Sequence, residues 1–224
     1  MTHNEPLTRV SLRTPKAAAI AGIVFSAMLI FIFWLLRVSV PADPLEPGAW
    51  LRSRSEPVLL ALNLIPFAGI AFLWFLGALR DRLGQLEDRF FATVFFGSAL
   101  LFVAMLFAAA AIAGAFVMAF SEWPDDMMKA NTFHFARAVT YNLMNVYAIK
   151  MAGMFMISTS TVVIYTAIAP RWIAILGYVL ALTLLFGSYY IGWSFMVLPI
   201  WVLLMSISML IDAFRRPADM RGDD

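Results

Sequence analysis

The chain of 224 residues contains no cysteine and only two histidines. The missing thiols exclude disulfide bonds, iron–sulfur clusters, cysteine-ligated zinc and thiol nucleophiles. A haem held by two histidines is excluded as well, because His3 lies in the polar N-terminal tail and His134 stands alone in the rest of the chain. We therefore expect no cofactor and no metal site.

Charged residues are also scarce, at 13% of the chain, while 62% of it is hydrophobic and the mean hydropathy is +0.85. A soluble domain carries about 25% charged residues. The composition predicts a polytopic membrane protein with a single membrane domain over residues 1–224. The Lys and Arg residues lie at segment ends and form no patch, so we expect membrane lipid as a partner and no nucleic acid.

Six apolar runs are long enough to cross a bilayer. They predict an all-α bundle of six transmembrane helices at about 17–38, 57–79, 90–120, 138–169, 172–189 and 193–214. The last two form one merged run of about 40 residues, which is twice the length of a single span. The first run, at about 20 residues, is longer than the core of a signal peptide and is expected to stay in place.

The fourth run is more polar than the others, since it carries Asn142, Asn145, Tyr147 and Lys150. A lysine at the centre of a membrane helix costs about 2.5–3.5 kcal/mol on insertion scales, so such residues mark candidate functional sites. Two interpretations stay open. The lysine pairs with backbone carbonyls or an outer carboxylate (Glu122, Asp125 or Asp126), or it forms a substrate site with the two asparagines and the tyrosine.

The geometry of a regular helix sorts these polar residues into two groups. At about 100° per residue, Thr140, Tyr147 and Lys150 share one face of the fourth run. Asn142 and Asn145 share another face.

The second run adds Asn63 to the candidate substrate-binding residues, together with a proline at position 66. Proline in a helix interior frees the carbonyl four residues earlier and kinks the helix. The kink serves packing, or it belongs to a broken helix that lines a site, as in transporters.

The third run sets small residues four apart, at Ala104 and Ala108, Ala110 and Gly114, and Ala111 and Ala115. Small residues let helix backbones approach closely in membranes. We expect this run to be the central helix of the bundle, with a dimer face as the alternative.

Catalytic chemistry has little support, and we expect no catalytic residue. Ser98, Ser188 and Ser194 neighbour glycines but lack the spacing of a known intramembrane protease. A zinc-protease HExxH element and a phosphate-binding glycine loop are both missing. The protein is therefore more consistent with a non-enzyme.

Residues 79–111 (LRDRLGQLEDRFFATVFFGSALLFVAMLFAAAA) and 169–185 (APRWIAILGYVLALTLL) carry a resemblance. They resemble small, Ala-rich, multi-pass bacterial membrane proteins, common in actinobacteria, whose function is unknown. The resemblance implies the bacterial plasma (inner) membrane. Most Lys and Arg residues flank the side on which the chain begins, so the positive-inside rule predicts that both termini are cytoplasmic.

Two function classes follow from the sequence. The first is an accessory, scaffold or regulatory subunit that acts through helix–helix contacts with another membrane protein or with itself. It is favoured by the scarcity of polar chemistry and by the small residues of the third run. The second is a small permease or channel with a polar site on the fourth helix, favoured by Lys150 and its polar neighbours.

Overall fold

The computed structural model describes residues 14–41, 51–83, 89–122, 131–166, 168–187 and 192–219, and every element in these ranges is helical. The long helices are α1 (Thr14–Ser39), α2 (Leu51–Leu83), α3 (Arg89–Glu122) and α8 (Val197–Asp219). The shorter ones are α5 (Asn131–Asn142), α6 (Ile149–Thr166) and α7 (Arg171–Leu182). Wide π turns follow α5 and α7, namely η3 (Leu143–Ala148) and η4 (Thr183–Gly187), and a 3-10 turn, η5 (Ser194–Met196), precedes α8.

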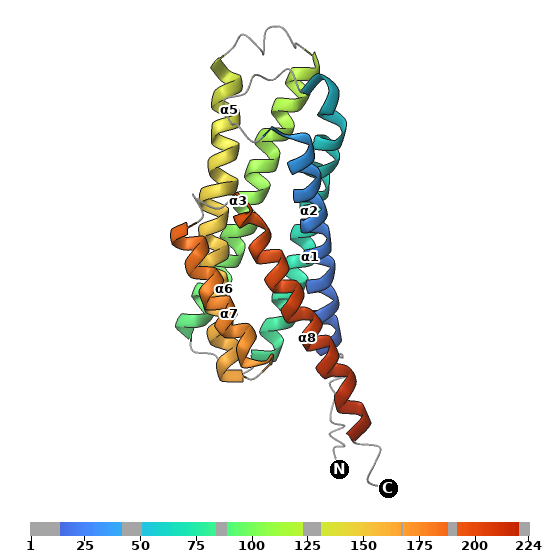
Figure 1. The fold of residues 1–224 in the computed structure, drawn as a ribbon, viewed down its shortest axis with the longest axis vertical. Helices are drawn as coiled ribbons and strands as arrows, with labels where there is room; N and C mark the ends of the chain where they lie inside the picture. Colours follow the sequence, from blue (N-terminus) through green and yellow to red (C-terminus); the bar gives the residue numbers. More distant parts are fainter. Residues whose placement is uncertain are drawn as a thin grey trace, which may run out of the picture.

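The helices form an antiparallel bundle in which most neighbours in sequence are neighbours in space (Figure 1). Helix α1 packs between α2 and α8, α3 packs between α2 and α6, and α7 packs against α6 and α8. The ammonium of Lys16 lies 4.5 Å from the ring centroid of Phe214, so α1 begins where α8 ends. We call this the proximal end, and the end at Ser39 and Leu51 the distal end.

A cluster of phenylalanine rings centred on Phe72 holds the helices together. Its ring centroid lies 4.6 Å from that of Phe25 on α1, 5.5 Å from that of Phe102 on α3 and 5.2 Å from that of Phe155 on α6. Rings from α1, α3 and α6 therefore all contact the side chain of Phe72 on α2. Tilted and edge-on ring pairs contribute about 0.5–1.5 kcal/mol each beyond the area that they bury.

Two glycines permit close helix contacts at the edges of this core. A Cβ added at Gly22 of α1 would collide with Ser206 of α8 and lie 2.8 Å from the Phe75 ring. One added at Gly177 of α7 would collide with Ser160 of α6 and lie 2.8 Å from the Trp201 ring. Ser206 and Phe75 therefore pack directly onto the backbone of α1 at Gly22. In the same way, Ser160 and Trp201 pack directly onto the backbone of α7 at Gly177.

The outward faces of the helices carry large apolar side chains rather than charges. Trp74 is 73% exposed, Tyr165 is 81% exposed and Phe186 is 80% exposed. Five helical segments are long and apolar enough to cross a membrane: Lys16–Ser39, Ser53–Arg80, Ala92–Glu122, Thr132–Thr166 and Ser194–Phe214. The predicted fifth span forms a shorter apolar helix, Arg171–Gly187.

The all-α prediction is confirmed over the described residues, while several boundaries differ from it. Helix α2 begins at Leu51, before the predicted start at 57, and contains Pro57 as well as Pro66. The fourth run begins as a helix at Asn131 instead of 138, because polar residues extend a helix beyond its apolar part. Hydropathy finds the apolar stretch and not the ends of the helix.

The third helix is not the central one, contrary to expectation. In its most apolar stretch 28% of the residues are buried, against 61% for the stretch that joins α5 to α6. Ala104, Ala111 and Ala115 are exposed, and a Cβ at Gly114 would meet nothing within 4 Å. Half of these small residues of α3 therefore lie on the outer surface while the others are half-buried, and α5–η3–α6 occupies the inner position.

Replacement of Gly177 should reduce the stability of the folded protein more than replacement of Gly77, another glycine within a helix. We expect Gly177→Ala to destabilise the folded protein by about 1–3 kcal/mol, because the buried Trp201 has no room to move. Gly77→Ala is the matched control, since a Cβ there meets nothing within 4 Å. Thermal unfolding in a mild detergent measures both, and equal midpoints for the two variants would contradict this packing.

Candidate functional site: a cationic cavity at the distal end

A cavity of about 560 Å³ lies in the distal half of the bundle, between α1, α2, α3, the α5–η3–α6 helix and the turn before α8. Its origin is the length of α7. That helix has 12 residues and η4 has five, against 34 residues in α3. Helices α7 and α8 therefore stop short of the upper ends of α3 and α5 (Figure 1), and the space beyond them is left hollow.

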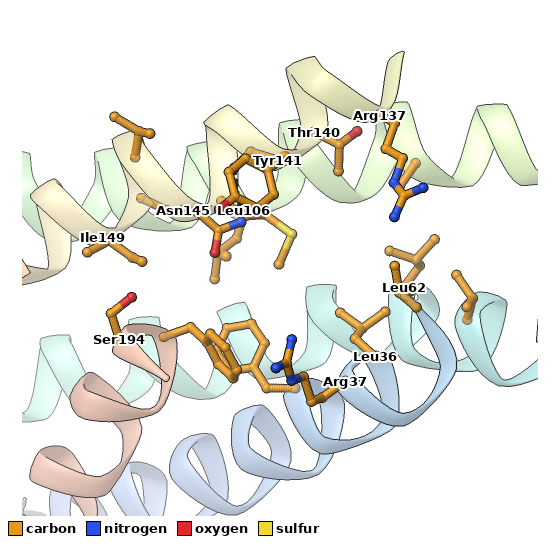
Figure 2. Close-up of a pocket in the computed structure, with 18 of the residues that line it drawn as sticks. Leu36, Arg37, Leu62, Leu106, Arg137, Thr140, Tyr141, Asn145, Ile149 and Ser194 are labelled. Carbon is orange, nitrogen blue, oxygen red and sulfur yellow. Dashed lines mark hydrogen bonds between the residues drawn. The ribbon is translucent and has the colours of Figure 1, made fainter. Parts of the chain in front are cut away.

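The walls of the cavity are mostly hydrocarbon. Leu36, Leu62, Leu106 and Ile149 point into it from four helices (Figure 2). At its inner boundary lies Phe102, whose ring contacts Phe72. Ligand cavities in proteins are typically about 300–1,000 Å³ and largely apolar with a few placed polar groups, so this one has the size and composition of a binding site.

Three cations line the cavity, and they are the only charged residues among the described ones that do so: Arg37, Arg137 and Lys150. Figure 2 shows the guanidinium groups of Arg37 on α1 and Arg137 on α5 pointing into the gap between these helices. Nη2 of Arg137 donates to the Pro41 carbonyl at 3.1 Å. The Arg37 guanidinium lies 5.6 Å from the Trp193 ring centroid, within the range of a cation–π contact.

The neutral polar groups of the cavity come mainly from the same inner helix. Thr140, Tyr141 and Asn145 line it from α5 and η3, and Ser194 lines it from η5 (Figure 2). The amide Nδ2 of Asn145 donates to the Tyr141 carbonyl at 3.1 Å. That bond leaves the amide oxygen of Asn145 as an acceptor on the cavity side of the helix.

Lys150 joins the two π turns of the structure. It follows η3 directly, and its Nζ donates to the carbonyls of Leu184, at 3.4 Å, and Leu185, both in η4. Carbonyls at the end of a helix lack partners within the helix, and a positive charge there is favoured by the helix dipole. The interpretation that the lysine pairs with backbone carbonyls is therefore confirmed. Of the carboxylates expected as alternative partners, Glu122 is exposed at the end of α3, and Asp125 and Asp126 lie outside the described residues.

The π turn η3 changes which residues of the fourth run face the cavity. The side chains of Asn142 and Asn145 donate to the carbonyls of Ala138, at 3.0 Å, and Tyr141, and compete there with the backbone. A π turn holds one residue more than an α turn, so the helix before it is rotated relative to the helix after it. The 100° rule for a regular helix therefore fails across residues 143–148.

The predicted site residues are accordingly divided. Asn145 and Lys150 both line the cavity, although they were assigned to different faces. Tyr147 is 58% exposed and does not line it, so its predicted shared face with the lysine is not found. Asn142 is exposed and also outside the lining.

The candidate on the second run lies apart from the cavity. Asn63 is exposed, and its Nδ2 donates to the carbonyl of Leu59 on its own helix at 2.9 Å. Its neighbour Leu62 lines the cavity instead. A site that joined Asn63 to the polar groups of the fourth run is not formed in this conformation.

Arg37 and Arg137 are the lining residues that sequence reasoning missed as site residues. Each stands at the end of an apolar run and reads as an ordinary helix-end cation. The sequence did show that both arginines lie at the same end of the predicted bundle and that the fourth run, next to Arg137, contains a lysine. It did not show that α7 stops short of that end and so leaves a cavity there.

Within the described ranges, no three histidine, aspartate or glutamate side chains come together as a metal site. His134 is exposed and lies edge-on to Phe133, with 5.2 Å between the ring centroids.

Comparison with known proteins adds no relative. No protein-family model matches the chain, and neither a curated protein nor a solved structure does so.

Loss of the Lys150 side chain should loosen the end of η4. In Lys150→Met the carbonyls of Leu184 and Leu185 lose this donor, and an unsatisfied buried carbonyl costs about 1–3 kcal/mol. We expect faster amide hydrogen exchange in residues 183–187, with Lys150→Arg retaining the protection of the native protein. Exchange in α1 serves as the internal reference. Unchanged exchange at 183–187 in the methionine variant would show that the lysine does not hold η4.

Proposed function

We propose that this chain is a six-pass protein of the bacterial plasma membrane with both termini in the cytoplasm. Five apolar segments of spanning length and the exposed apolar side chains on the bundle surface support membrane insertion. The contact between Lys16 and Phe214 supports an even number of crossings, because α1 begins beside the end of α8. In this arrangement Arg171–Gly187 is the fifth of the six crossings, short enough that the bilayer or its neighbours must adapt to it.

We further propose that the protein is a small permease or carrier whose substrate binds in the distal cavity. The observation that carries this proposal is the convergence of Arg37, Arg137 and Lys150 on one largely apolar cavity. Ionisable residues within membrane segments face the bundle interior and mark substrate or ion pathways. In the proposed topology the cavity lies in the outer half of the bilayer.

The inner boundary of the cavity favours a carrier over an open channel. Phe102 closes the cavity toward the proximal end, and behind it the Phe72 cluster fills the core between α1, α2, α3 and α6. A substrate that enters from the distal end therefore stops at these rings. Release to the other side requires that the rings separate, which is the behaviour of an alternating-access protein.

The second candidate is the accessory subunit that acts through helix–helix contacts. It is favoured by the exposed small residues of α3, which would let a helix of another protein or a second copy approach closely. This class needs no occupant in the cavity. The two classes are therefore distinguished by whether the protein, once extracted from its own membrane, has a small molecule or another protein bound to it.

Native mass spectrometry of the tagged protein, extracted from its own membranes in a mild detergent, tests the permease proposal. We expect a small molecule bound to the native protein and lost from Ala113→Phe, because Ala113 lines the cavity and a benzyl group there would fill part of it. The identified molecule should then cross proteoliposome membranes that contain the native protein.

The same experiment can contradict the proposal in two ways. A small molecule retained equally by Ala113→Phe would place its binding outside the cavity. A foreign protein bound in fixed ratio, with no small molecule, would support the accessory class instead. Ala111→Phe is the matched control, because Ala111 lies on the same helix, is exposed and does not line the cavity.

The topology has its own test. We expect a green fluorescent protein fused to the C-terminus to fluoresce and an alkaline phosphatase fused there to be inactive, since both termini are proposed to be cytoplasmic. The phosphatase fused after Pro41 should be active. An active C-terminal phosphatase would mean an odd number of crossings or an inverted orientation.

A further inference from the structure

We infer that the distal cavity opens sideways into the bilayer, and that a lipid of the outer leaflet places one acyl chain in it. The inference rests on the proposed function, because it uses the proposed membrane topology and names the ligand class of the same site. Two observations carry it, namely the position of the exposed lining residues and the apolar nature of the walls. It assigns no charge preference for the head of the lipid.

The exposed members of the lining lie together on one side of the cavity. A residue that lines a cavity and is also exposed marks where the cavity meets the exterior. Among the described residues, those that meet both conditions belong to α1, to the α5–η3 segment or to the turn before α8: Arg37, Tyr141, Val146 and Gly192. The cavity therefore opens between these three parts of the bundle.

Toward the distal end of the bundle the lining is buried instead. Leu51 at the start of α2, Val117 near the end of α3 and Phe133 near the start of α5 line the cavity there, and none is more than 3% exposed. The Phe133 ring also packs against Phe116 of α3, with 4.9 Å between the ring centroids. The way into the cavity through the described part of the chain is therefore lateral.

Contacts hold both edges of this opening. Figure 2 shows α1 and α5 on opposite sides of the cavity. At the distal edge, the hydrogen bond from Arg137 to the Pro41 carbonyl joins the two sides at 3.1 Å. At the proximal edge, the Phe195 ring of η5 lies 5.0 Å from the Phe33 ring of α1 and 5.9 Å from the Trp193 ring, measured between centroids. The opening is thus a bounded gap in the wall of the bundle.

The surface around the opening has the composition of a membrane interface. Trp34, Tyr147 and Trp193 lie within three residues of the exposed lining residues, and each is more than half exposed. Tyrosine and tryptophan are enriched where the headgroups of a bilayer meet its acyl chains. In the proposed topology, a lipid with its head at this level in the outer leaflet has its acyl chains beside the opening.

The interior of the cavity is suited to such a chain. Leu62, Leu106 and Ile149 point into it from three helices (Figure 2). The medium outside a lateral opening is hydrocarbon, so the molecule that enters through it is a chain of the bilayer. An acyl chain in contact with these walls keeps water from them, at about 25 cal/mol per Å² of apolar surface.

The cations of the lining leave this apolar interior accessible to a chain. Arg37 is exposed at the rim of the opening, and Arg137 lies at its distal edge. Lys150 donates to carbonyls of η4, at the wall of the cavity. An acyl chain that enters between the two edges passes over leucine and isoleucine side chains.

Photolabelling from within the bilayer tests the inference. The full-length protein is placed in nanodiscs of phosphatidylcholine, some of which carries a photoreactive diazirine near the end of one acyl chain. After irradiation, digestion and mass spectrometry locate the lipid adducts. We expect adducts at Leu62, Leu106 and Ile149, which are buried and are reached only from inside the cavity.

Three positions of the native protein serve as internal controls. Leu29 and Phe95 are also buried but do not line the cavity, and we expect no adduct at either. Trp74 is exposed on the outer surface of α2 and should be labelled by the surrounding bilayer. The adduct at Trp74 then gives the scale against which labelling of the interior is measured.

Two substitutions obstruct the chain at different points. Val146→Trp narrows the opening and Ala113→Phe fills part of the cavity. We expect each to lower the Leu106 adduct about tenfold relative to Trp74, which corresponds to an overpacking cost of about 1.4 kcal/mol. Val179→Trp is the matched control, because Val179 is exposed on α7 outside the lining and should leave labelling unchanged. Thermal unfolding establishes that each variant is folded.

The other outcomes overturn defined parts of the inference. Adducts confined to the outer surface of the native protein would overturn the acyl chain as occupant. Interior adducts that persist in Val146→Trp but are lost from Ala113→Phe would overturn the lateral opening. A diazirine-bearing octanol, added from water, is the second probe. Interior labelling by this alcohol without labelling by the lipid would assign the cavity to a free apolar molecule.

Failure of this inference is distinguishable from failure of the permease proposal. An acyl chain located in the cavity by labelling, with no ligand moved across proteoliposome membranes, would uphold the inference and contradict transport. A substrate that is transported, by a protein whose cavity is never labelled from the bilayer, would uphold transport and overturn the acyl chain.

Discussion

The distal half of the molecule depends on the bond between one lysine and the end of one short helix. Lys150 donates to the carbonyls of Leu184 and Leu185, and so ties η4 to α6. Everything beyond η4 is built by four helices instead of six, and it is hollow for that reason. The insertion cost of a lysine is thereby offset by carbonyls that a terminating helix would otherwise leave without this donor.

The proximal half is organised by a different force. Here the aromatic rings of the Phe72 cluster pack four helices together, and Gly22 and Gly177 let neighbouring helices approach closely. Dense packing of this kind resists small deformations and moves only as a whole. The proximal half of the molecule is therefore densely packed, whereas the distal half contains the cavity. The ring of Phe102 lies between the two, since it lines the cavity and contacts Phe72.

The composition and apolar runs were sufficient to predict an all-helical chain and the positions of its main segments. They failed where the outcome depends on what lies opposite a residue. The small residues of α3 have the spacing of a packing interface whether they face a neighbour or the exterior, so the sequence could not show that Ala111 is exposed. Lys150 was identified because its charge is rare in such a run. Arg37 and Arg137 were not identified as site residues, because arginine at a helix end is common.

The wide turn at Leu143–Ala148 has a consequence for how this chain can change in evolution. Its one surplus residue makes the segment a natural place for a single-codon deletion, which would leave a regular helix and little strain. Such a deletion rotates α5 by about 100° relative to α6. A different set of α5 side chains would then face the interior after one deletion, while Lys150 and the densely packed proximal half keep their positions. A lineage could acquire a new specificity here without passing through an unfolded intermediate sequence.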